Sequence, residues 1–108
     1  MTTITFTTSD DKYVSVECKG HAGYDDYGKD IVCSAISVLM INLVNSLEQF
    51  TDDSIKLSEN EKKGLIKITF DDIPSKEAEL LLKSFELGVT SIYEQYGKKF
   101  LNIKFRRE

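Results

Sequence analysis

The stretch VCSAISVLMINLVNSLEQF, residues 32–50, decides the fold because it is the longest apolar segment of the chain. It is too long and too apolar for a strand, so we predict a helix that is buried on most of its sides. Within it, the run AISVLMINLV is interrupted by Ser37 and Asn42. We consider this run too short to span a bilayer, so we expect a core helix and no membrane partner.

Two shorter segments before this helix alternate polar and apolar side chains, a pattern typical of half-buried strands. Residues 2–7 alternate threonine with isoleucine and phenylalanine. Residues 12–19 continue the alternation, with Val14, Val16 and Cys18 on one apolar face. We therefore predict two consecutive strands that turn these faces toward the same core.

Two strands and a second helix are predicted after the long helix. The strands lie near residues 54–58 and 64–70, joined by the polar turn SENEKKG. The helix is opened by Pro74 and Ser75, with proline in its first turn, and ended by Gly97. Its apolar stripe keeps the three-and-four spacing of an amphipathic helix: Ala78, Leu81, Leu82, Phe85, Val89, Ile92, Tyr93 and Tyr96.

Alternation over residues 101–105 predicts one last strand, so the element order is β-β-α-β-β-α-β. Strand pairs separated by single helices favour an α+β fold, with a mainly antiparallel sheet packed with two helices. We assign residues 1–108 to a single domain, because 41% hydrophobic residues suffice for one core. The pattern leaves the order of the strands in the sheet open.

Charge and cysteine content indicate a soluble cytoplasmic protein. The net charge of −4 argues against direct nucleic-acid binding, because phosphate contacts need a basic face. An acidic protein can instead attract basic peptides over long range. The first 11 residues lack the pattern of a signal peptide, and two cysteines without one indicate reduced thiols in the cytoplasm.

The segment GHAGYDDYGKD, residues 20–30, contains the only histidine of the chain, His21, and three of its six glycines. Asp30 precedes the apolar helix and is predicted to be its N-cap. Cys33 would then lie in the first helical turn, where free amides and the positive end of the dipole favour a thiolate. Ser37 follows four residues later on the same helical face.

Taken alone, these residues leave several explanations open. A histidine and a cysteine brought together by the fold make a base and a nucleophile. The same two residues with two aspartates could bind zinc, or the segment could be a plain surface loop. Neither a CxxC nor an HxxxH spacing nor a calcium-loop pattern is present, so we expect no metal and no other cofactor. Cys18 fits a buried core position better than Cys33 does.

The residues around the loop match a known two-part signature: Gly20, His21, Ala22, Gly28, Asp30, Ile31, Val32, Cys33, Ala35 and Ser37. They resemble the pattern GHA…G-x-DIVC-x-A-x-S of the ribosomal-processing cysteine protease (Prp) family of Firmicutes, formerly a YsxB-like domain of unknown function. The resemblance covers the whole chain in length and element order. Ser34, where the family more often has alanine, is a mild departure.

The resemblance implies a cytoplasmic, dimeric cysteine endopeptidase. Its substrate would be the precursor of ribosomal large-subunit protein L-twenty-seven, whose N-terminal extension is removed by a cut after an aromatic pair. Cys33 would be the nucleophile and His21 its base. The other matching residues would shape the site and the substrate loop: Gly20, Gly28, Asp30 and Ser37.

Two further expectations concern activity and assembly. A non-catalytic ribosome-assembly or peptide-binding module using the same Gly-rich loop is the alternative to an enzyme. Leu80 and Leu87 lie one heptad apart on the second predicted helix and off its apolar stripe. They predict a homodimer surface, unless the curvature of the sheet covers them.

Overall fold

Five strands and two helices follow one another in the predicted order in the computed structural model, which describes residues 1–20 and 27–108, and the side chains of 1–20 and 31–108. The elements are β1 Thr2–Ser9, β2 Lys12–Lys19, α1 Tyr27–Phe50, β3 Ile55–Asn60, β4 Leu65–Phe70, α2 Lys76–Tyr96 and β5 Leu101–Arg107. The predicted order and the α+β class are therefore confirmed.

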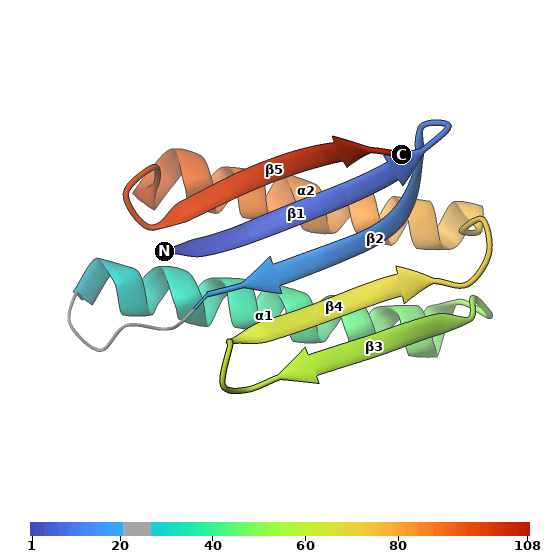
Figure 1. Ribbon diagram of the computed structural model, residues 1–108, viewed down its shortest axis with the longest axis horizontal. Coiled ribbons are helices and arrows are strands. Elements are labelled where there is room, and N and C mark those ends of the chain that lie inside the picture. The colour runs from blue at the N-terminus through green and yellow to red at the C-terminus, as the bar shows by residue number, and fades with distance from the viewer. Residues whose placement is uncertain (21–26) are drawn as a thin grey trace.

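The strands form one sheet in the order β3-β4-β2-β1-β5. Three neighbouring pairs are antiparallel, whereas β5 pairs with β1 in parallel, so the sheet is mixed but mainly antiparallel, as predicted. Both helices lie on the same face of this sheet (Figure 1). Only one face of the sheet therefore contacts the helices. This explains why apolar and polar residues alternate along the strands in the sequence.

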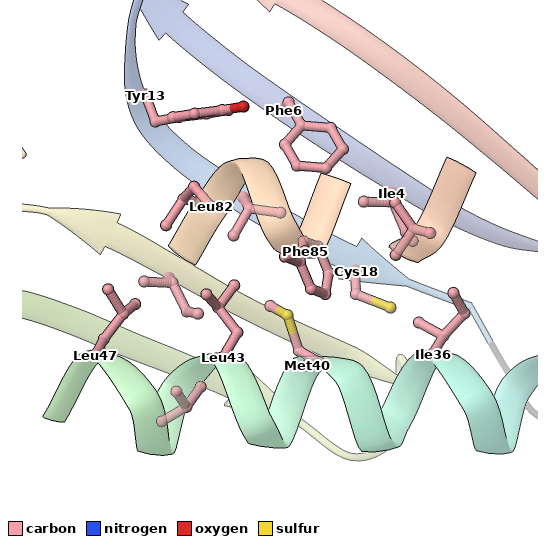
Figure 2. Packing of buried hydrophobic residues seen from close by; sticks show 14 of the residues in the cluster. Ile4, Phe6, Tyr13, Cys18, Ile36, Met40, Leu43, Leu47, Leu82 and Phe85 are labelled. Atoms are coloured by element: carbon pink, nitrogen blue, oxygen red, sulfur yellow. The ribbon is translucent and has the colours of Figure 1, made fainter. Parts of the chain in front are cut away.

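The core lies between the sheet and the two helices (Figure 2). Its fully buried side chains come from both layers: Ile4, Phe6, Val16, Val32, Ile36, Met40, Leu47, Ile68, Leu82, Val89 and Leu101. The apolar stripe of α2 supplies four buried residues, but Tyr96 at its end is 43% exposed. Tyr96 is the last residue of the helix and is largely open to solvent, so the predicted apolar stripe is one turn too long.

A β-bulge corrects the predicted face of β2. Thr7 pairs with Ser15 and Thr8 pairs with Tyr13, so Val14 is an extra residue without a cross-strand partner. The extra residue reverses the alternation, and Tyr13 rather than Val14 is buried. The Tyr13 hydroxyl donates a 2.8 Å hydrogen bond to Glu86, and burial together with this bond raises the pKa of Tyr13.

The start of α2 is fixed by a cap and by a second contact. The Ala78 amide donates a 3.1 Å hydrogen bond to the hydroxyl of Ser75, which is the N-cap. The Ser75 amide and hydroxyl both donate to the carboxylate of Asp53, just after α1. Pro74 precedes the cap, so the prediction that it lies in the first turn of the helix is wrong.

The membrane expectation needs one correction. Within α1, residues Ile31–Phe50 form a 20-residue stretch that is long and apolar enough to cross a membrane by length and composition alone. The prediction that this segment is too short to span a bilayer is therefore wrong for the helix as a whole. The packing of the helix distinguishes it from a membrane-spanning helix, because Ile36, Met40 and Leu47 from this stretch lie in the core of a globular domain.

Candidate active site

Cys33 is held where α1 meets the start of β1. Its side chain is half-buried, and its Sγ lies 3.4 Å from the Oγ1 of Thr2. Thr2 is only 4% exposed, and its amide donates a 3.0 Å hydrogen bond to the carbonyl of Phe100. The thiol therefore faces the start of β1, which is held in place by its burial and by the hydrogen bond to Phe100.

The helix starts earlier than the sequence suggested. α1 begins at Tyr27, so Gly28 and Asp30 lie inside its first turn, and Asp30 is not the N-cap. The amides of residues 27–29 then have no intrahelical partner, and Cys33 lies in the second turn. The effect of the helix dipole falls off within the first turn, so it contributes less to a Cys33 thiolate than we expected.

A pocket of about 410 Å³ opens beside the Cys33 thiol. It lies between α1, the starts of β1 and β4, and the turn that joins β3 and β4. The described residues that line it are Thr2, Cys18, Gly20, Cys33, Ile36, Ser37, Met40, Ile41, Glu59, Asn60, Glu61, Gly64, Leu65 and Ile66. Most of its wall is apolar, and Glu59 and Glu61 are the only charged groups among these residues.

Gly20 lines this pocket and lies in close contact with the backbone of Met1 and Thr2. Its φ is +140°, and a Cβ there would lie 2.5 Å from the carbonyl oxygen of Met1 and 2.8 Å from the Cα of Thr2. The Gly20 amide donates a 3.2 Å hydrogen bond to the carbonyl of Gly64, in the β3–β4 turn. Glycine is required here by backbone angle and by space.

Cys18 lines the same pocket but is chemically different from Cys33. It projects from β2 toward α1, close to Ile36 and Met40 (Figure 2), and it is 9% exposed. Burial raises the pKa of the Cys18 thiol to about 11, and the nearby charges of Cys33 and Glu17 add to this effect. Cys18 is therefore a protonated core residue at neutral pH, as its strand register predicted.

The structure brings three of the predicted site residues to one pocket, namely Gly20, Cys33 and Ser37. His21 lies outside the described residues. Sequence reasoning missed Thr2 and the β3–β4 turn. Thr2 carried a signal, since it shares the inward register of the first strand, but the turn is far from Cys33 in sequence and carried none.

A larger cavity of about 530 Å³ lies at the other end of α1. Among the residues that line it are Phe50, Asp53, Ile73 and Ser75, and none of the described lining residues is a cysteine. Its size alone does not make it an active site. The pocket beside Cys33 is the candidate, because there a cysteine thiol lies next to an apolar wall.

The sequence profile of the cysteine protease Prp family matches residues 1–101. This chain belongs to that family. The ribosomal processing cysteine protease Prp of Staphylococcus aureus is 30% identical over 106 residues, which cover 96% of this chain and 100% of the relative. Membership of the Prp family makes the protein a cysteine protease, so the non-catalytic alternative is set aside.

Solved structures agree with the Prp fold. A crystal structure of a Streptococcus mutans protein has a TM-score of 0.89 and 37% identity, covering 100% of this chain and 96% of that one. S. aureus Prp with a covalently linked product peptide has a TM-score of 0.87 and 27% identity, covering 98% and 100%. S. aureus Prp with a substrate peptide has a TM-score of 0.85 and 28% identity, covering 100% of both chains.

Proposed function

We propose that this Prp-family protease removes the N-terminal extension of ribosomal large-subunit protein L-twenty-seven, cutting after an aromatic pair, with Cys33 as nucleophile and His21 as base. The observation that carries the proposal is the Cys33 thiol on the wall of the 410 Å³ pocket. The match to the GHA and DIVC parts of the family signature supports the same pair of residues.

The substrate class is supported by the relatives. Those of S. aureus are called ribosomal processing proteases, and S. aureus Prp has been crystallised with a substrate peptide. In this chain, Ile36, Met40 and Ile66 line the pocket next to the thiol. An apolar wall of this kind fits an aromatic side chain immediately before the cleaved bond.

The charge of the pocket supports a basic substrate. Glu59 and Glu61 are exposed at its rim, and neither forms an ion pair with a described residue. Ribosomal proteins bind RNA and therefore carry basic segments. Two carboxylates in the pocket that also contains the thiol, on a chain with net charge −4, would attract such a segment and reject acidic peptides.

The proposed reaction follows ordinary thiol-protease chemistry. His21 takes the proton of Cys33, and the thiolate attacks the carbonyl carbon after the aromatic residue, forming an S–C bond. The tetrahedral intermediate collapses with loss of the C–N bond, and His21 gives its proton to the leaving amine. Water then hydrolyses the thioester and restores the Cys33 thiol. Cys33 and His21 would be held in place by the other signature residues, Gly20, Gly28, Asp30 and Ser37.

We place the enzyme in the cytoplasm, where ribosomes are assembled, and we expect it to act as a homodimer. Leu80 and Leu87 are 68% and 70% exposed on α2, so the curvature of the sheet does not cover them. Exposed leucines one heptad apart on a helix are suited to packing against a second copy. No direct contact with nucleic acid and no metal or cofactor is needed for this function.

Incubation with the L-twenty-seven precursor tests the proposal directly. The wild-type protein should shorten the precursor by its extension, and Cys33→Ala should leave it intact. Cys18→Ala is the matched control, since it removes the other thiol of the same pocket and should retain cleavage. If Cys33→Ala cleaves the precursor as the wild type does, Cys33 is not the nucleophile. If the wild type leaves this precursor intact but cuts another ribosomal protein, the substrate assignment is wrong.

A further inference from the structure

Thr2 is a buried residue with a polar side chain that faces the candidate nucleophile. Its side-chain oxygen lies 3.4 Å from the Cys33 sulfur, and the residue is 4% exposed. Its backbone belongs to β1, where it pairs with Leu101 of β5, and its amide is bonded to Phe100. Gly20 packs directly on its Cα side. The hydroxyl is therefore held in place.

We propose that Thr2 is a positioning residue for catalysis, whose hydroxyl donates a hydrogen bond to the Cys33 thiolate. The proposal rests on the proposed role of Cys33 as nucleophile. Thr2 does not touch the substrate in this scheme. It acts through the sulfur, by holding it in one orientation and by favouring its charged form.

The chemistry of the contact gives it a direction. With a neutral thiol, either the hydroxyl or the S–H can donate. A thiolate has no proton to give, so the Thr2 hydroxyl becomes the donor and the sulfur the acceptor. Hydrogen bonds to a charged acceptor are stronger than neutral ones, so the contact stabilises the thiolate more than the thiol.

The position of Cys33 in α1 makes a hydrogen-bond donor from outside the helix useful for stabilising a thiolate. Because α1 begins at Tyr27, the free amides of the helix end lie a full turn before the sulfur. A donor on β1 can supply part of what those amides do not. A buried hydroxyl also needs a partner, since an unsatisfied one is costly. No described buried side-chain N or O atom lacks one, and the Thr2 oxygen has the Cys33 sulfur at 3.4 Å.

The test compares variants that separate the hydroxyl from the shape of the side chain. Thr2→Val keeps the shape and removes the donor, whereas Thr2→Ser keeps the donor and removes a methyl group. Thr5→Val is the control, because Thr5 lies on the same strand in the opposite register, where it pairs with Glu17. The readout is the rate of Cys33 alkylation by iodoacetamide against pH, followed by peptide mass.

In Thr2→Val the alkylation profile should move to higher pH and the rate at neutral pH should fall about tenfold, the size expected for one lost bond to a charged group. On a peptide substrate, kcat should fall with KM nearly unchanged. Thr2→Ser and Thr5→Val should follow the wild type. If Thr2→Val fails to fold, Thr2→Ala compared with Thr2→Ser asks the same question.

Two outcomes would overturn the proposal. If the Thr2→Val profile superimposes on that of the wild type, the hydroxyl does not act on the sulfur. If Thr2→Ser behaves like Thr2→Val, the methyl group and its packing are what matter. Failure of the proposed function would look different: precursor cleavage would survive in Cys33→Ala, whereas the alkylation profiles would still report on Thr2.

Discussion

Gly20 lies directly against Thr2, so closely that a β-carbon on Gly20 would be 2.8 Å from the Thr2 Cα. Thr2 in turn contacts the Cys33 sulfur at 3.4 Å. The start of β1 therefore bridges the residue that precedes His21 and the proposed nucleophile. This relationship explains in physical terms why the signature has a glycine immediately before its histidine.

Gly20→Ala should lower the free energy of unfolding. The φ of +140° strains any L side chain, and the new methyl group would meet the backbone of Met1 and Thr2, which cannot rotate away. We expect a loss of about 1–3 kcal/mol in urea unfolding, typical of a forced backbone conformation. Gly88→Ala is the control, because its methyl group would meet only the flexible end of Leu39. Equal unfolding midpoints for the two variants would contradict this explanation.

His21→Ala should slow precursor cleavage by about a hundredfold to ten-thousandfold, the usual contribution of a general base. It should also move Cys33 alkylation to higher pH, because a cationic imidazolium beside the sulfur favours the thiolate. If the two side chains form the proposed ion pair, their protons are coupled, and the profiles report values that belong to the pair. Superimposable alkylation profiles for wild type and His21→Ala would mean that the two side chains do not interact, and the dyad would have to be abandoned.

Glu59→Gln combined with Glu61→Gln should weaken binding of basic substrates. Exposed charge pairs contribute about 0.2–1 kcal/mol each, so the loss of two should raise KM about two- to thirtyfold at low salt, with kcat unchanged. Added salt should raise the KM of the wild type and affect the variant less. Asp52→Asn with Glu77→Gln removes two carboxylates from the distant cavity and should change neither value. An unchanged KM in the first variant would remove the rim from substrate selection.

Leu80→Glu combined with Leu87→Glu should give a folded monomer in analytical ultracentrifugation. Both leucines are more than two thirds exposed, so charges there should leave the core intact but oppose packing against a second copy. Ile73→Glu is the matched control, since Ile73 is 79% exposed in the segment between β4 and α2. A dimer that survives the double change would place the interface elsewhere on the molecule.

Asp53 should give a pH-dependent contribution to stability. Burial alone would raise the pKa of its carboxyl, but the hydrogen bonds from Ser75, together with those of Thr51 and the Asp53 backbone, outweigh burial and lower the pKa. Because the folded-state pKa is below the unfolded value, the carboxylate stabilises the fold above about pH 4, and this contribution is lost as pH falls through the folded value. The difference in unfolding free energy between wild type and Asp53→Asn should be full at pH 7 and smaller at pH 3. A difference that is the same at both pH values would show that charge is not involved.

The succession of elements and their inward faces could be predicted from the sequence, because side-chain alternation and the three-and-four spacing are local properties. Ser75 and Gly97, which delimit α2, were readable for the same reason. The motif around Cys33 was readable as well, since its residues are close together along the chain. The candidate nucleophile thus needed no tertiary structure to be singled out.

The remaining features depend on contacts between segments that are far apart in the sequence. The parallel pairing of β5 with β1 and the bulge at Val14 are decided by which strands meet, and no local pattern records that. The first turn of α1 extends into the glycine-rich segment, whose local propensity favours a loop. By itself the sequence determined the elements, most of their apolar faces and the candidate thiol. Only the tertiary structure decided that Thr2 and the β3–β4 turn surround that thiol, because side chains from different strands meet only after the sheet has formed.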